Sequence, residues 1–435
     1  MLRSSIVVTA ITLLGSAMGF VVQLILAHHF GAGTDVDVYL FALSWPTFFA
    51  GMVSAFLSYV AIPQLVARES DPAGQRDYFT TSTIAISVFA VVVILIGFGL
   101  GELQTASLPA DSPIRAHAQR ARLVSIGWFI CAAQIGQAYL LSALHAKRHH
   151  VTSAGLGLLP YVGMIVSTVL FAEQIGVSSV AAGMLAGTIA STAAAAWFLR
   201  GRFVSDKPRR WPWAETRALF AAAPYAVVAL SCFSIYAVVD AFWAPRAGEG
   251  TLASLGYAQR LVIAIGNLAV AGPSAILVPR ITELVRQAAP GTLRHFLRKT
   301  LVTVGVGAAI FALPLALAPE LLVRLLFARG NFSETNVGNI AATLAHMTPG
   351  MVCMLVSVIS LRAMFCIPGA ERAAAVLGGA WGFLYFATSA LMVSRGAPGL
   401  ASAYSMTWVT ICVCIITVLF KKAGGDAHGR APAGC

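Results

Sequence analysis

Residues 79–101 read FTTSTIAISVFAVVVILIGFGLG, a run without a single charged side chain. A helix needs about 20 predominantly apolar residues to cross the hydrocarbon core of a bilayer, and this run is long enough. Similar runs recur along the 435 residues of the chain, which is 58% hydrophobic and only 11% charged, with a mean hydropathy of +0.81. A soluble domain carries about 25% charged residues. The sequence therefore predicts an all-α polytopic membrane protein and excludes a soluble enzyme or nucleic-acid-binding domain.

Twelve such runs predict about 12 transmembrane helices. They lie at residues 4–28, 37–62, 79–101, 123–146, 151–172, 177–199, 218–243, 253–278, 300–319, 338–361, 373–393 and 398–420. The apolar stretch of a cleaved signal peptide is only about 7–15 residues long, which is shorter than the first run. We therefore expect the first run to be a retained helix.

Lysine and arginine are distributed unequally between the two sets of loops. The N-terminus and the loops after even-numbered spans hold 21 of the 29 basic residues, the opposite loops hold seven, and Arg260 lies within the eighth span. Cytoplasmic loops are enriched in basic residues, so both termini are expected in the cytoplasm. We interpret the net charge of +12 as this topological bias, together with attraction to anionic lipids, and predict no nucleic-acid partner.

A short motif occurs once in each half of the chain. GAGT at residues 31–34 precedes the second span, which ends near Pro63, and GEGT at residues 248–251 precedes the eighth, which ends near Pro279. The threonine and the proline are 29 residues apart in the first copy and 28 in the second. This agreement predicts a duplicated six-helix unit whose two copies share one orientation, as in many transporters.

The duplication predicts two parallel six-helix lobes joined by a basic linker. The expected domains are an N-terminal lobe at 1–199, a cytoplasmic linker at 200–217, a C-terminal lobe at 218–420 and a disordered cytoplasmic tail at 421–435. Two such lobes suit alternating access to a central site. The duplication therefore favours a transporter over a channel.

Ionisable side chains within the spans are few, and such residues are usually functional because a buried charge in a bilayer is costly. Asp37 begins the second span, Asp240 lies near the outer end of the seventh, and Arg260 lies about two turns into the eighth. Asp240 and Arg260 are expected at similar depth, either as a structural ion pair or as part of a substrate or ion site. Asp37 either caps its helix or belongs to that site, since an acid near a helix N-terminus complements the dipole.

Neutral polar residues within the spans are further candidates for substrate binding. They include Gln23, Gln134, Gln137 and Asn267. Gln134 and Gln137 are three residues apart and share a helical face, so they either line a cavity or hydrogen-bond between helices.

The sequence offers no catalytic, metal or cofactor motif. The seven cysteines show no metal-ligand spacing, and we interpret His145, His149 and His150 as a cytoplasmic helix end. No nucleophile–base grouping, paired carboxylates or phosphate-binding glycine loop is found. We therefore predict a protein that is not an enzyme and that has no metal or cofactor.

Three segments carry a family likeness. The first contains Gly19-Phe20, FGAG at 30–33, Asp37 and VAIP at 60–63. The second is YAQRL at 257–261 followed by LVPRI at 277–281, and the third is LLFARGNF at 325–332, which is the most specific. These segments resemble the MurJ-type (MviN) lipid II flippases of the MOP superfamily. The resemblance implies two lobes in a V and a bacterial inner-membrane flippase for undecaprenyl-diphosphate-linked saccharides. By carry-over, Asp37 and Arg260 match polar positions of the family's cavity, where a guanidinium binds diphosphate bidentately.

The chain departs from the family pattern at several positions. Where the family has basic residues and a following acid in helix one, and a basic pair in helix two, this chain has Ser16, Val22, Gln23, Ala50 and Gly51. It also ends after twelve predicted spans, whereas the family carries two more that form a groove for the lipid tail. Both departures favour an exopolysaccharide or O-antigen repeat unit as the cargo instead of lipid II.

Three other functions stay open at this point. They are an ion-coupled, MATE-like multidrug antiporter, a non-transporting scaffold of a polysaccharide assembly complex, and a polytopic glycosyltransferase or ligase. In a transporter, Asp37 and Asp240 are the candidates for coupling to an ion gradient. The expected partners are a lipid-linked oligosaccharide, membrane lipid and proteins of polysaccharide or cell-wall assembly.

Overall fold

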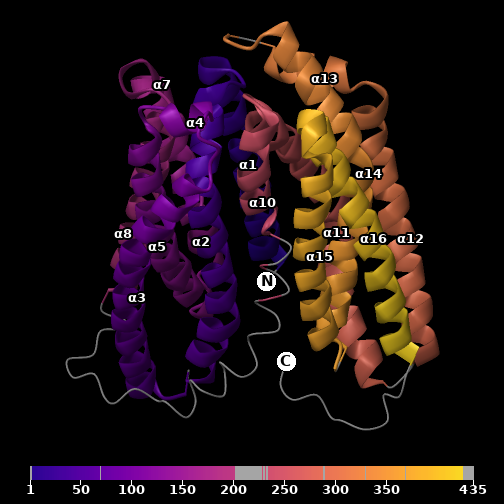
Figure 1. Cartoon of the computed structure of the whole chain (residues 1–435). Helices are drawn as coiled ribbons and strands as arrows, with labels where there is room; N and C mark the ends of the chain where they lie inside the picture. The colour runs from indigo at the N-terminus through magenta and orange to yellow at the C-terminus, as the bar shows by residue number, and fades with distance from the viewer. Residues whose placement is uncertain are drawn as a thin grey trace. The chain divides into compact units, whose positions relative to one another are not determined.

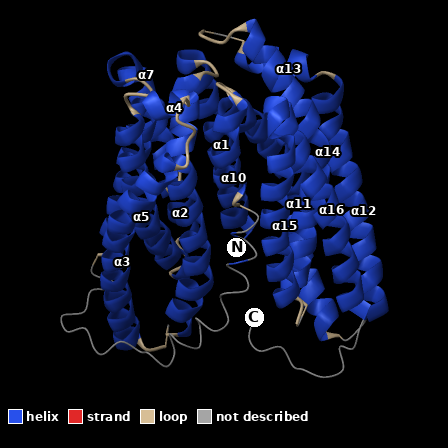
Figure 2. Ribbon diagram, in the orientation of Figure 1, coloured by secondary structure: helices blue, strands red, loops and turns tan. Residues whose placement is uncertain are grey.

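The computed structural model describes residues 2–68, 70–200, 228, 231, 234–287, 290–328, 330–367 and 369–424 (Figure 1). Every regular element in these ranges is helical, and none of them is a strand (Figure 2). Nine segments of the described chain are long and apolar enough to cross a membrane, and the last, Glu371–Gly424, contains two helices. The all-α membrane class is therefore confirmed. The total of twelve stays a prediction, because part of the seventh span lies outside the described residues.

The chain divides into two compact units, of which the first is Met1–Val227 together with Arg329–Phe332. Its helices are α1 (Leu2–Phe30), α2 (Thr34–Ala67), α3 (Pro72–Ala106), α4 (Pro113–Ala116), α5 (Arg120–Ala146), α6 (His150–Leu156), α7 (Leu159–Ile175) and α8 (Ser178–Leu199). The run predicted as one span at 151–172 is two helices, α6 and α7. The break at Gly157 and Leu158 precedes Pro160, which lacks the N–H that a continuous helix requires.

The second unit is Val228–Ala328 together with Ser333–Cys435. Its elements are α10 (Tyr236–Ala247), α11 (Thr251–Arg286), α12 (Pro290–Leu317), α13 (Pro319–Phe327), α14 (Glu334–Phe365), α15 (Glu371–Met392), the short 3-10 helix η1 (Val393–Arg395) and α16 (Gly396–Gly424). Residues 421–424 of the expected tail belong to α16, which continues through Gly424 with Lys421 and Lys422 in its last turn, where cations complement the helix dipole. Apart from Arg200 and residues 421–424, the predicted linker and tail lie outside the described residues.

The two units share one packing order. Helices α2 and α11 both begin at the threonine that follows a Gly-x-Gly turn, after Gly33 and Gly250. In the first unit α5 packs against α2, α3 and α8, and in the second α14 packs against α11, α12 and α16. In the apolar stretch of α5, 61% of the residues are buried, and the share is the same in α14. The fourth predicted span of each half is thus the central helix of its unit, which supports the duplication seen in the sequence.

Close approach of α7 and α8 depends on glycine. A Cβ placed on Gly183 would overlap the carbonyl oxygen of Gly163, and one placed on Gly187 would overlap that of Leu159. Small residues four apart let membrane helices approach this closely. We expect Gly183→Leu to lower the free energy of unfolding by at least about 1–3 kcal/mol through overpacking. The thermal stability of the purified protein in detergent measures this effect. Gly99→Leu on α3 is the control, because its Cβ would meet open space, and equal losses in the two variants would contradict the prediction.

A serine from α16 is inserted into the hydrogen-bond ladder of α14. The Gly350 N–H donates to Ser405 Oγ at 3.0 Å, and this hydroxyl donates to the His346 carbonyl at 2.6 Å. Both backbone groups would otherwise bond to each other within α14, next to the helix-breaking Pro349. Ser405→Ala is expected to cost about 1–3 kcal/mol of stability, because the Gly350 N–H and the His346 carbonyl both lose the hydroxyl that bridges them. Thr410→Ala removes a hydroxyl that bonds only within α16, so a similar loss of thermal stability there would contradict this explanation.

Candidate functional site

The carboxylate of Asp240 is enclosed within the second unit. Asp240 lies one turn into α10, and only 2% of its surface is exposed. Its Oδ2 accepts a hydrogen bond from Gln259 Nε2 of α11 at 2.6 Å, and its Oδ1 accepts one from the Tyr385 hydroxyl of α15 at 2.5 Å. Both oxygens are therefore satisfied by neutral donors, which offsets the cost of burying the group.

Aromatic rings from α15 and α16 surround this carboxylate. Tyr385 stacks on Trp381 with ring centroids 5.3 Å apart, and its edge contacts Tyr404 at 5.9 Å. Trp381 also contacts Trp408 at 5.0 Å, and all four side chains are buried. A low-dielectric enclosure strengthens the hydrogen bonds to Asp240 and makes its charge state sensitive to any change around it. Buried acids of this kind serve proton and ion pathways in membrane transporters.

Arg260 is not the partner of Asp240. It directly follows Gln259 on α11, and consecutive residues of a helix point about 100° apart. Its side chain is exposed, and within the described part of the chain no ion pair joins it to Asp240 or to another carboxylate. It lies nine residues after Thr251, which is about 13 Å along α11. The expected ion pair is therefore replaced by a neutral amide, and the guanidinium is left available to a ligand.

In the first unit, Asp37 occupies the first turn of α2 and is only 2% exposed. Its backbone N–H donates to the Gly33 carbonyl at 3.1 Å. This is the position where a helix dipole stabilises a negative charge. Gln23 of α1 is also buried, at 8% exposure. Both the capping role of Asp37 and its role in binding stay predictions.

The two glutamines of α5 lie in different environments. Gln137 is buried and donates to Ser191 Oγ of α8 at 2.7 Å, and Ser191 in turn donates to the Leu156 carbonyl of α6 at 2.8 Å. Gln137 is thus a packing residue. Gln134 is half-exposed and is not part of that network. Of the two interpretations offered by their spacing, the interhelical hydrogen bond describes Gln137.

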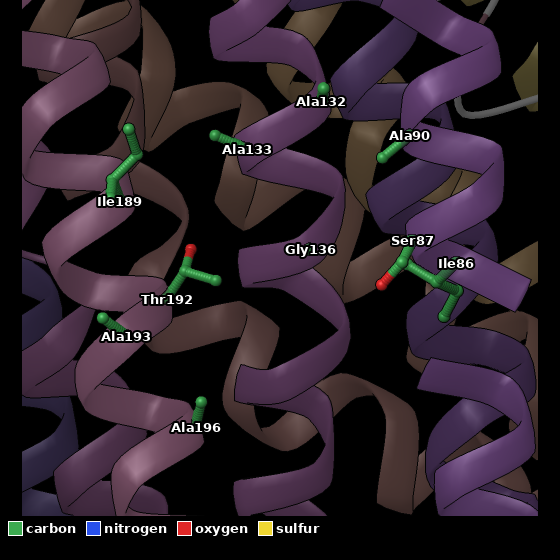
Figure 3. A pocket seen from close by; sticks show the side chains of 10 residues that line it. All are labelled: Ile86, Ser87, Ala90, Ala132, Ala133, Gly136, Ile189, Thr192, Ala193 and Ala196. Carbon is green, nitrogen blue, oxygen red and sulfur yellow. The ribbon is translucent and has the colours of Figure 1, made fainter. Parts of the chain in front are cut away.

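An apolar groove of about 440 Å³ lies between α3, α5 and α8 (Figure 3). Small residues such as Ala133, Gly136 and Ala193 form most of its wall, with Ser87 and Thr192 as its hydroxyl-bearing members. Neither Gln134 nor Gln137 lines it. The groove therefore offers no charged group for a polar head group.

Asn267 belongs to α11, but its side chain lies outside the described residues. At the turn between α5 and α6, His145 Nδ1 lies 3.0 Å from His150 Nδ1. The described residues contain no group of three or more histidine, cysteine or acidic side chains that could hold a metal ion.

Sequence reasoning missed two members of the Asp240 site. Gln259 stands inside the YAQRL segment, directly before the arginine that was singled out, and this adjacency was a usable signal. Tyr385 is 145 residues from Asp240 in the chain. No spacing rule connects residues on separate membrane helices at that distance.

The two comparisons of sequence agree on one family. A family model for the lipid II flippase MurJ matches residues 26–431. A probable lipid II flippase MurJ of Vibrio cholerae serotype O1 is 24% identical over 390 residues, which cover 83% of this chain and 72% of that protein.

Solved structures of a lipid II flippase and of a multidrug transporter match almost the whole chain. A lipid II flippase MurJ in an inward closed conformation matches with a TM-score of 0.80 and 15% identity, over 96% of this chain and 90% of that one. An inward-facing multidrug resistance MATE family transporter of the MOP superfamily matches with a TM-score of 0.76 and 13% identity, over 96% of this chain and 99% of that one. At these identities the structural matches establish the fold.

Proposed function

The chain belongs to the MurJ family of lipid II flippases, and from this premise we propose that it moves an undecaprenyl-diphosphate-linked saccharide across the bacterial inner membrane by alternating access. Membership makes it a multi-pass transport protein of that membrane with a lipid-linked substrate. The finer proposal concerns which saccharide it carries and which residues bind it.

The observation that supports this function best is the state of Arg260. An arginine about 13 Å along a membrane helix is costly unless an anion compensates it. The described residues provide no carboxylate partner for it. A diphosphate supplies the missing charge, and the planar guanidinium matches its oxygens bidentately. We therefore assign the diphosphate of the substrate to Arg260.

The remaining polar candidates are assigned to the saccharide or to ion coupling. Gln23, Gln134 and Asn267 are proposed to contact sugar hydroxyls, since amide groups both donate and accept hydrogen bonds. Gln137 is withdrawn from that set because Ser191 already engages its amide. Asp240 is the proposed coupling acid, and Asp37 is the second candidate.

The substrate proposed here is an exopolysaccharide or O-antigen repeat unit, with lipid II as the other possibility. Ser16, Val22 and Ala50 stand at positions where the resemblance leads us to expect basic residues, so the site has fewer cations than one built for lipid II. In this proposal, Arg260 of the second unit binds the diphosphate that all these lipids share.

Rescue of two bacterial hosts tests the function. One host is depleted of its own lipid II flippase, and the other lacks the flippase for an exopolysaccharide or O-antigen unit. We expect this chain to restore polymer export in the second host. Rescue of the first host alone would make lipid II the cargo, and failure in both hosts despite good membrane expression would contradict flippase activity. Resistance to cationic drugs without rescue would favour the antiporter.

A further inference from the structure

The segment from Arg329 to Phe332 belongs to the first unit, although Ala328 before it and Ser333 after it belong to the second. It forms the end of LLFARGNF, the most specific motif of the sequence, and neither the Arg260 site nor the Asp240 site uses it. Gly330 and Asn331 contact the last turn of α1.

Asn331 supplies hydrogen bonds that the end of α1 lacks. The last carbonyls of a helix have no partner within the helix. The Ala27 carbonyl accepts from the N–H of Gly31, but the next two depend on Asn331. The Asn331 N–H donates to the His28 carbonyl at 3.0 Å, and Asn331 Nδ2 donates to the His29 carbonyl at 2.7 Å. Asn331 therefore caps α1, although it lies 302 residues after His29 in the sequence.

Gly330 is the residue that lets this segment approach. Its φ of +67° lies in the left-handed region, which favours glycine. A Cβ at this position would also overlap the carbonyl oxygen and the imidazole of His28. Both the backbone conformation and the close approach require glycine here. Phe332, only 9% exposed, follows directly.

We propose that residues 330–332 are a detachable cap on α1, and that the cap docks and releases during transport. Gly330 and Asn331 are both exposed, so water can replace their hydrogen bonds when the segment leaves. Release would free the last turn of α1 and the GAGT turn that leads into α2. The chain on either side of the segment, at Ala328 and Ser333, belongs to the second unit. The role in transport rests on the proposed flippase function, whereas the cap itself does not.

Hydrogen exchange of the full-length protein in lipid nanodiscs tests docking without any transport assay. The readout is the peptide that contains the Asn331 amide, which the bond to His28 protects. We expect Gly330→Ala to speed its exchange by roughly tenfold, since one hydrogen bond of this kind is lost. The control is Gly369→Ala, which has the same kind of positive φ (+76°) but no atom within 4 Å of a Cβ. Equal exchange in wild type and Gly330→Ala would overturn the cap.

Release of the cap is tested by locking it. In a variant without the native cysteines, His29→Cys and Asn331→Cys are expected to form a disulfide that stops rescue until it is reduced. A fully crosslinked protein that still rescues would overturn the release step. Gly330→Ala should also lose rescue while Gly369→Ala keeps it. If wild type rescues neither host, the flippase function fails, yet the exchange measurement still reports on the cap.

Discussion

Arg260→Ala is expected to reduce transport by about 100-fold or more while leaving the protein in the membrane. A hydrogen bond to a charged group contributes about 1.5–3 kcal/mol, and 1.4 kcal/mol is a factor of ten. Loss of a bidentate contact to diphosphate therefore amounts to at least two factors of ten. Folding should not suffer, because the side chain is exposed and forms no ion pair within the described chain.

The measurement is the rate of polymer export in the rescued host, normalised to the amount of protein in the membrane. Arg260→Lys should fall between wild type and alanine, because it keeps the charge but cannot bind two oxygens in a fixed geometry. Arg122→Ala is the matched control, since Arg122 is another exposed arginine, at the start of α5. Transport by Arg260→Ala at the wild-type rate would remove Arg260 from the substrate site.

The fold could be predicted almost entirely from the sequence because a bilayer imposes simple rules. Uncharged runs have to be helices, and the runs at 79–101 and 338–361 lie inside α3 and α14. One predicted span contains a break that local chemistry explains. Pro160 divides the run at 151–172 into α6 and α7, because a proline cannot donate the hydrogen bond that would join them. A span predicted from the average hydropathy of about 20 residues does not show the effect of one missing backbone N–H.

The candidate site was less predictable because it depends on the direction of side chains. The prediction placed Asp240 and Arg260 close together because they lie at similar depth along their helices. In the structure, the direction of the side chains around α11 decides, and Gln259 forms the hydrogen bond to Asp240. The depth of a residue in the membrane can be predicted from the sequence more easily than the direction of its side chain. Gln137 illustrates the same limit, since its partner Ser191 is on a different helix.

Asp240→Asn is expected to keep the fold and to lose ion coupling. Asparagine has the shape of aspartate but cannot carry the charge or exchange the proton. Gln259 can rotate its amide so that its oxygen accepts from the new Nδ2, and Tyr385 can still donate to Oδ1. The free energy of unfolding should therefore change by less than about 1 kcal/mol, whereas Asp240→Leu should lose about 1–3 kcal/mol for each donor left without an acceptor.

Transport is measured in energised membrane vesicles before and after the proton or sodium gradient is dissipated. Wild type should slow when the gradient is lost, whereas Asp240→Asn should be about tenfold slower at the start and indifferent to it, because a charge that senses the gradient is gone. Tyr385→Phe is the control, since it removes one hydrogen bond but keeps the acid and the ring that stacks on Trp381. It should lose stability and stay gradient-dependent. If transport by Asp240→Asn also stays gradient-dependent, Asp240 is a structural acid that connects α10 to α11 and α15. The candidate for ion coupling is then Asp37, the other buried acid of the proposal.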